Sequence, residues 1–251
     1  ICIIGMFTSS CTSKKASRTE GSHEAEQELT MIVGTYTSGD SKGLYSFRFN
    51  EENGTATALS EAEVENPSYL VPSADGKFIY AVSEFSNEQA AANAFAFNKE
   101  EGTFRLLNTQ KTGGEDPCYI ITNGSNVVTA NYSGGSISVF PIDKDGSLLP
   151  ASEVVKFKGS GADKERQEKP HLHCVRITPD GKYLFADDLG TDQLHKFIVN
   201  PNAKADNEDV FLKEGSPASY KVEAGSGPRH LTFAPNGSYA YLINELSGTV
   251  I

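Results

Sequence analysis

Basic clusters are missing from most of this chain, and their absence narrows the range of functions. Past residue 30 no run of lysine and arginine occurs, and the net charge of the 251-residue chain is −11. Proteins that bind nucleic acid carry basic patches, so we expect no nucleic-acid partner. The acidic balance also repels anions, which means that an anionic substrate would have to be bound by local basic side chains.

Helical patterns are also nearly absent after residue 29. Ala90, Ala91 and Ala92 form the only stretch that favours a helix, and three residues are too few for a stable one. Short runs that alternate apolar and polar residues recur instead, separated by turns rich in Gly, Asn, Asp and Pro. With 38% hydrophobic and 22% charged residues, the composition suits a globular domain. We therefore expect an all-β fold.

Cysteine is scarce, and the four cysteines divide into two pairs. Cys2 and Cys11 lie in the first eleven residues. Cys118 and Cys174 lie in predicted strands among apolar neighbours, where a cysteine is most often a buried free thiol. A disulfide between these two stays open, because an exported protein reaches an oxidising compartment. No neighbouring residues indicate a cysteine nucleophile.

The N-terminal segment has no apolar run long enough to span a bilayer. Residues 1–11, ICIIGMFTSSC, join a short apolar run to small residues, which is typical of the end of a secretion signal. Ser9-Ser10-Cys11 is similar to the lipobox of bacterial lipoproteins, in which the cysteine is acylated, although Thr8 replaces the usual Leu. A plain signal peptide is the alternative. We predict an exported protein, periplasmic or membrane-anchored through Cys11; without a working signal it would stay cytoplasmic.

Two further segments follow the predicted signal. Residues 12–28 are polar and aperiodic, which predicts a flexible tether. The β pattern then runs through residues 29–251. Because the chain begins with Ile and Ile251 directly follows the start of a predicted strand, we expect 29–251 to be an incomplete domain.

Residues 227–246, GPRHLTFAPNGSYAYLINEL, show the organisation of this domain most clearly. Two alternating runs flank a Pro-Asn-Gly turn at residues 235–237, a pattern typical of a β-hairpin. The two ends of a hairpin lie side by side, so Arg229 and Glu245 are predicted neighbours. They would form either a structural ion pair or part of an active site.

Similar units occur earlier in the chain. They begin at prolines 67, 117 and 170, and with the proline at 228 the period is about fifty to sixty residues. This period is typical of a β-propeller blade and is too long for leucine-rich or ankyrin repeats. Alignment of the units on their Asp-Gly or Asn-Gly turns makes Ser68, His173 and Arg229 nearly equivalent, and Glu84 equivalent to Glu245. Such residues surround the central channel of a propeller.

Seven motifs in the same order resemble the lactonase family of seven-bladed β-propellers. They are GTYT at 34–37, SKGLYSF at 41–47, NPSYL at 66–70, ANYSGGSISVF ending at 140, PHLH at 170–173, DDLGTDQL at 187–194, and the stretch at 227–246. The resemblance covers about residue 30 to the end. It implies a ring of four-stranded blades, of which this chain would hold roughly the first four to five.

The resemblance also implies an activity and a site. The activity is hydrolysis of a sugar lactone of the 6-phosphogluconolactonase type, without a cofactor, by a protein that we expect to be a monomer. Catalytic roles fall on His173, Arg229 and Glu245. The residues expected to contact the substrate are His171, His230, Glu84 and Asn131. A further arginine of the family lies beyond the last residue of this chain.

These residue types suit lactone hydrolysis, which needs an activated water and a stabilised oxyanion. Glu245 or His173 would activate the water, and Arg229 would bind the oxyanion or an acidic group of the substrate. Export departs from the cytosolic setting of sugar-phosphate metabolism and the pentose phosphate pathway. Whether the lactone is phosphorylated therefore stays open.

A metal site is an alternative use of the same histidines. His171 and His173 could bind a divalent ion together with Asp187 or Asp188. Calcium requires several oxygen ligands, and zinc requires a third ligand that the sequence does not identify. We therefore expect no metal.

Two other functions also stay open. A relative of the same fold closes lactones as a muconate-lactonizing cycloisomerase, and this chain could do likewise. Alternatively, the protein could be a binding scaffold without catalysis. Its binding surfaces would then be two stretches that we predict to be exposed loops, residues 156–169 and 200–216.

Overall fold

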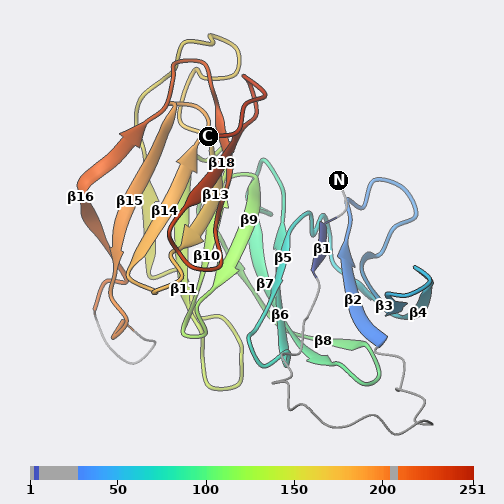
Figure 1. Ribbon diagram of the computed structural model, residues 1–251. Coiled ribbons are helices and arrows are strands. Elements are labelled where there is room, and N and C mark those ends of the chain that lie inside the picture. The colour runs from blue at the N-terminus through green and yellow to red at the C-terminus, as the bar shows by residue number, and fades with distance from the viewer. Residues whose placement is uncertain (1–2, 6–27, 204–208) are drawn as a thin grey trace, which may run out of the picture.

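The computed structural model describes residues 3–5, 28–203 and 209–251, and the regular elements in these ranges are all strands (Figure 1). The expectation of an all-β fold is confirmed. Most of the predicted signal and tether, including Cys2 and Cys11, lies outside the described residues. Within the described ranges, no helix is long and apolar enough to cross a membrane.

The strands of these ranges form five antiparallel sheets in chain order. Sheet 1 contains β1 (Ile3–Gly5), β2 (Glu28–Gly34), β3 (Gly43–Asn50) and β4 (Ala56–Glu63). Sheet 2 contains β5 (Leu70–Pro72), β6 (Phe78–Ser83), β7 (Ala91–Asn98) and β8 (Thr103–Lys111). Sheet 3 contains β9 (Pro117–Thr122), β10 (Asn126–Asn131), β11 (Ser136–Pro141) and β12 (Glu153–Lys156). Sheet 4 contains β13 (Leu172–Ile177), β14 (Tyr183–Asp188), β15 (Gln193–Val199) and β16 (Leu212–Lys221), and sheet 5 contains β17 (Pro228–Phe233) and β18 (Ala240–Asn244).

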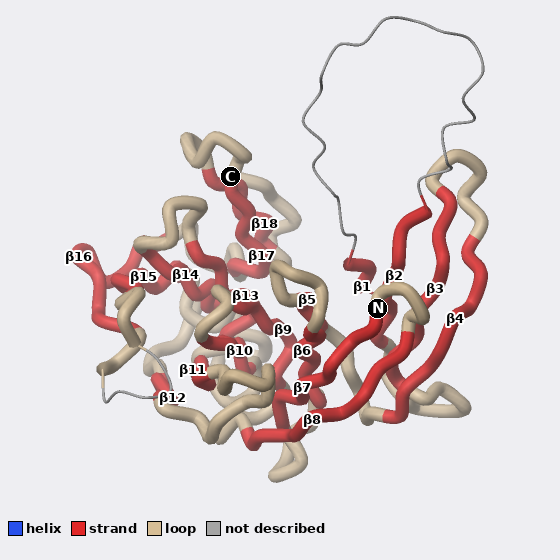
Figure 2. The backbone as a smooth tube through the Cα atoms, turned by 90° about the horizontal axis from the view of Figure 1, so that it is seen from below, coloured by secondary structure: helices blue, strands red, loops and turns tan. Residues whose placement is uncertain are grey.

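Successive sheets are arranged like the blades of a propeller. The first strands of sheets 2 to 5, β5, β9, β13 and β17, lie next to one another. The last strands β4, β8, β12 and β16 lie at the periphery (Figure 2). Pro117 begins β9 and Pro228 begins β17, while Pro67 and Pro170 lie shortly before β5 and β13. The repeat predicted from the prolines is confirmed, with four sheets and the first hairpin of a fifth.

Apolar side chains fill the spaces between neighbouring sheets. Phe95 lies in the cluster between sheets 1 and 2, Tyr80 in that between sheets 2 and 3, and Leu184 in that between sheets 3 and 4. Strands β10 and β11 are buried at every position because sheets cover both of their faces. Their polar side chains, such as Asn131 and Ser138, are therefore buried along with the apolar ones. The packed sheets form the rigid frame that carries the loops of the site.

Two stretches predicted as exposed loops are partly built into the fold. Residues 212–216 of the second stretch belong to β16, and Gln167 of the first stretch is 0% exposed. The loop prediction was wrong at residues 212–216 and at Lys156, the last residue of β12, whereas Gln167 lies in a loop as predicted but is buried rather than exposed. Strand β16 is an outer strand with mostly exposed side chains, so its sequence lacks clear alternation. It also contains Pro217, which an edge strand tolerates.

Candidate active site

A cavity of about 550 Å³ lies where the first strands of the sheets converge. All five sheets, or the loops next to them, contribute to its wall. The lining residues are Tyr36, Ser68, Tyr69, Glu84, Cys118, Tyr132, Arg166, His173, Arg229, His230 and Glu245. This volume is within the range of roughly 300–1,000 Å³ that is usual for small-molecule sites.

Three of the lining residues occupy equivalent places in their sheets. Cys118, His173 and Arg229 each lie in a first strand, at the point where its register with the second strand shifts by one residue. Such a β-bulge leaves one residue unpaired and changes the direction of its side chain. The repeat therefore supplies a thiol, an imidazole and a guanidinium to one wall. Cys118 and Arg229 directly follow the repeated proline, whereas in sheet 4 the residue after Pro170 is His171, which does not line the cavity.

The predicted contact between Arg229 and Glu245 is confirmed. Strands β17 and β18 pair as a hairpin, and its turn contains Gly237 with φ of 68°, a conformation that glycine adopts readily. Arg229 Nε donates to Glu245 Oε2 at 2.8 Å. His173 Nε2 lies 3.8 Å from the same oxygen. The three residues predicted to be catalytic therefore meet around one carboxylate.

Arg166 is a second arginine at this carboxylate, and sequence reasoning missed it. Its Nη2 donates to Glu245 Oε1 at 2.5 Å and lies 3.4 Å from the Tyr132 hydroxyl. Arg166 belongs to a charged stretch without alternation, and nothing in that pattern indicates a pocket residue. The outcome is that each oxygen of Glu245 contacts a different guanidinium.

The charges at this wall follow from burial and from the two arginines. Burial raises the pKa of Glu245, but the hydrogen bonds from Arg166 and Arg229 outweigh it and hold this pKa below its usual value. Burial, with the charge of Arg229 next in effect, lowers the pKa of His173 to about 3. The same two causes lower the pKa of His230 to about 4. Near neutral pH, Glu245 is therefore ionised and both imidazoles are neutral.

Glu84 lies on another part of the wall and contacts hydroxyl groups. The Tyr36 hydroxyl donates to Glu84 Oε2 at 2.9 Å, and the Ser68 hydroxyl donates to the same oxygen. Burial and the charge of Glu84 raise the pKa of Tyr36 to about 12. This group of polar side chains, which includes the predicted substrate residue Glu84, can exchange hydrogen bonds with sugar hydroxyls.

Two other predicted substrate residues do not line the cavity. His171 is buried, with Nε2 3.1 Å from Glu168 Oε1 and its ring stacked on Tyr132 at 4.4 Å. Asn131 is buried inside sheet 3, where it donates to Ser136 and to another serine hydroxyl of β11. The structure thus brings His230 and Glu84 into the wall with the catalytic candidates and leaves His171 and Asn131 behind it.

The set of residues considered for a metal does not converge. In the described part of the chain, no three His, Cys, Asp or Glu side chains are grouped as a metal site requires. The Asp188 carboxylate accepts hydrogen bonds from the His171 backbone and the Thr191 hydroxyl. Asp187 is buried next to Cys174 instead.

Cys118 and Cys174 are free thiols, as expected from their apolar surroundings. The open question of a disulfide is thereby settled, because the two sulfurs are not joined. Burial raises the pKa of both thiols well above the ordinary value, so neither is a thiolate near neutral pH. Cys118 nevertheless lines the cavity, and its Sγ donates to the His173 carbonyl at 3.5 Å.

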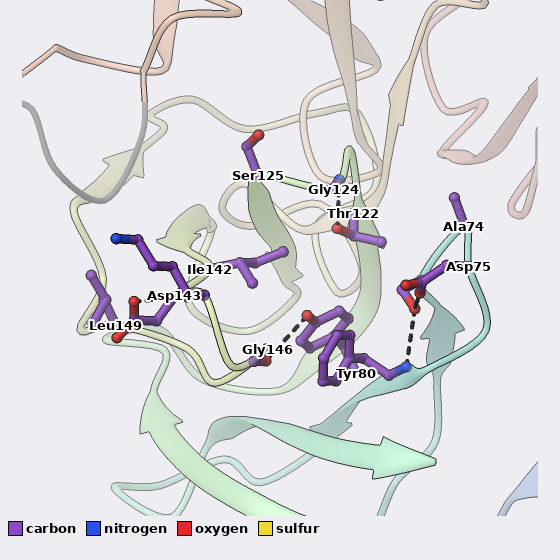
Figure 3. Close-up of a pocket in the computed structure, with 13 residues that line it drawn as sticks. Ala74, Asp75, Tyr80, Thr122, Gly124, Ser125, Ile142, Asp143, Gly146 and Leu149 are labelled. Atoms are coloured by element: carbon purple, nitrogen blue, oxygen red, sulfur yellow. Dashed lines mark hydrogen bonds between the residues drawn. The ribbon is translucent and has the colours of Figure 1, made fainter. Parts of the chain in front are cut away.

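A second cavity, of about 770 Å³, opens at the other ends of the strands, between sheets 2 and 3 (Figure 3). Phe78 and Tyr80 form part of its wall, and the Tyr80 hydroxyl donates to the Gly146 carbonyl at 3.2 Å. Its rim carries the exposed side chains of Asp143 and Lys144. No histidine or arginine lines it. Although it is larger, it lacks the combination of histidines, arginines and a carboxylate found in the first cavity, so the first cavity is the candidate active site.

The sequence model of the family described as "Lactonase, 7-bladed beta-propeller" matches residues 30–251. The chain belongs to this family. The fold expectation drawn from the seven motifs is thereby confirmed, with sheets 1 to 5 as successive blades of the lactonase propeller.

Three similar proteins illustrate the relation. The chain is 38% identical to a 6-phosphogluconolactonase of Formosa agariphila over 227 residues, 88% of this chain and 62% of that protein. A Bacteroides fragilis crystal structure, provisionally named a 6-phosphogluconolactonase, has a TM-score of 0.90 and 70% identity, covering 92% of this chain and 65% of that one. The periplasmic gluconolactonase of Pseudomonas aeruginosa has a TM-score of 0.80 and 34% identity, covering 88% and 62%. The chain thus spans less than two thirds of each relative.

Proposed function

We propose that the full-length protein hydrolyses a sugar-derived lactone, as a 6-phosphogluconolactonase does, to the aldonic acid. The observation that carries the proposal is the meeting of His173, Arg229 and Glu245 in one cavity of the lactonase propeller. The names of the two lactonase relatives and of the gluconolactonase support the reaction class.

The geometry is compatible with a hydrolysis that needs no metal. A water oxygen attacks the carbonyl carbon of the lactone while its proton passes to neutral His173. The imidazolium that forms lies 3.8 Å from the Glu245 carboxylate, which offsets part of the destabilisation of its charge by burial and by Arg229. The terminal nitrogens of Arg229 have no protein partner among the described residues and can donate to the oxyanion. The ring C–O bond then breaks, and the leaving oxygen takes the proton back from His173.

The experiment is a panel of sugar lactones, phosphorylated and unphosphorylated, assayed on the full-length protein. We expect Arg229→Ala and Glu245→Ala to abolish turnover without loss of folding, measured by circular dichroism. Because the reaction consumes water, ¹⁸O from labelled water should appear in the carboxylate of the product. Full activity in either variant would refute the assignment. Lactone formation without incorporated label would instead identify a cycloisomerase.

We also propose that the protein acts outside the cytoplasm. The signal-like residues 1–11 and the periplasmic location of the Pseudomonas relative support this proposal. Cells that express the full-length protein should incorporate labelled palmitate into it, and Cys11→Ala should remove the label. Detection of the unlabelled protein in the cytoplasm alone would refute export.

A further inference from the structure

We propose that Arg166 is a specificity-determining residue that binds the acyl oxygens of the ligand, and that Gln167 and Asp192 position it. The inference rests on the proposed lactone-binding role of the same cavity. Arg166 lines the cavity with a side chain that is 46% exposed. Its Nη2 is engaged by Glu245 and Tyr132, while Nε and Nη1 have no partner among the described residues. These donors are available to a ligand.

The charge balance at this wall favours an acidic ligand group. Two guanidiniums, those of Arg166 and Arg229, face the single carboxylate of Glu245. His173 and His230 add no charge near neutral pH, because burial lowers the pKa of each imidazole. The other carboxylate of the cavity, Glu84, lies on a different part of the wall and accepts hydrogen bonds from two hydroxyl groups, so the excess of one positive charge is confined to the part of the wall around Glu245. The carboxylate of an aldonic acid supplies one negative charge and two acceptors, which suits the forked donors of arginine.

The loop that carries Arg166 is held by its neighbour Gln167, whose side chain is 0% exposed. Gln167 Oε1 accepts from the Asp163 amide at 3.0 Å. Gln167 Nε2 donates to the Leu189 carbonyl and to Asp192 Oδ1, both at 2.8 Å. The Arg166 amide itself donates to Asp163 Oδ1 at 3.0 Å. Arg166 therefore projects from a loop with a fixed backbone rather than from a free surface segment.

Asp192 connects this loop to the second arginine. It is 6% exposed, and its carboxylate accepts from the Gly225 amide at 2.8 Å and the Gly227 amide at 2.9 Å. Gly227 lies two residues before Arg229 in the chain. The buried carboxylate of Asp192 thus positions the backbone next to both arginines. Three N–H donors, from Gln167, Gly225 and Gly227, satisfy its oxygens.

The test is calorimetric binding of gluconate and of 6-phosphogluconate to the full-length protein and its variants. We expect Arg166→Met to weaken the affinity for an aldonate by about ten- to a hundredfold, the effect of losing a charge-assisted hydrogen bond. Arg166→Lys should recover part of the affinity, because it keeps the charge but not the fork. Lys164→Met is the matched control, since Lys164 is an exposed cation on the same loop.

The positioning role of Gln167 and Asp192 is tested separately, by aldonate affinity and by kcat. Gln167→Met should weaken aldonate binding, and the double variant with Arg166→Met should bind no more weakly than Arg166→Met alone, because Gln167 acts through Arg166. Asp192→Asn should lower kcat as well as affinity, because Asp192 also positions the segment before Arg229.

The outcomes separate this inference from the proposed hydrolysis. Unchanged aldonate affinity in Arg166→Met, or no aldonate binding by the wild-type protein, overturns the role of Arg166. Additive effects of the two substitutions overturn the positioning role of Gln167. If no lactone is turned over while Arg166-dependent aldonate binding is present, hydrolysis fails and the binding assignment holds.

Discussion

Replacing Asp187 by asparagine should stabilise the protein at neutral pH and remove part of its pH dependence. Asp187 lies on β14 opposite Cys174 and is 0% exposed. Neither of its carboxyl oxygens has a hydrogen-bond partner in the described structure. Burial raises its pKa well above the ordinary value of 3.8, and the nearby Cys174 and Arg176 offset only part of this effect. The carboxyl of Asp187 therefore stays protonated to a higher pH in the folded protein than in the unfolded chain.

The magnitude follows from proton linkage. Above pH 3.8 the unfolded chain releases the proton of this carboxyl while the folded protein keeps it. The folded state then binds more protons, so the free energy of unfolding falls by about 1.4 kcal/mol for each pH unit until the folded pKa is reached. An asparagine at 187 has nearly the same shape and does not titrate. For each pH unit between the unfolded and the folded pKa of Asp187, the wild-type protein should lose about 1.4 kcal/mol relative to Asp187→Asn.

The assay is urea unfolding of the full-length wild type and variant at several pH values from 4 to 7. Only the difference between the two proteins is interpreted, because other groups titrate equally in both. Asp40→Asn, at an exposed position, is the control and should show no such trend. Parallel stability curves for the wild type and Asp187→Asn would show that Asp187 is ionised when folded, and the reasoning from burial would fail.

Two further predictions concern the side chains of the cavity. His173→Asn should lower kcat by about a hundred- to ten-thousandfold if His173 is the base, and steady-state kinetics with an active lactone would measure it; a change below tenfold would favour Glu245 as the base. Cys118→Ala should keep most of the activity, because burial keeps this thiol protonated, and loss of turnover in a folded variant would instead assign Cys118 a chemical role.

The repeat was predictable from local signals. The prolines at 67, 117, 170 and 228 and the Asn-Gly and Asp-Gly turns act within a few residues, so they reveal hairpins before any tertiary contact is known. The same local reasoning placed Arg229 next to Glu245. Alignment of the repeated units on their turns made His173 equivalent to Arg229, and the family motifs then gave His173 a predicted catalytic role.

Other features depended on contacts between distant segments. Strand β16 lacks clear alternation because it is an outer strand with mostly exposed side chains, so its first residues resemble a loop in sequence. Arg166 contacts Glu245, which lies 79 positions further along the chain. The loop of Arg166 is held by the buried Gln167, and the sequence around Gln167 shows no pattern that predicts its burial. The neutral state of His173 likewise results from burial by other sheets.

The order of residues was therefore sufficient to establish the repeated β-hairpins, the family and the pairing of Arg229 with Glu245, because each depends on neighbours in the chain or on linear motifs. Folding alone decided that Arg166 joins the cavity while His171 and Asn131 stay behind its wall, and what charge the lining side chains carry. Burial and the approach of a second guanidinium depend on how distant segments of the chain pack together, so no short stretch of sequence encodes either of them.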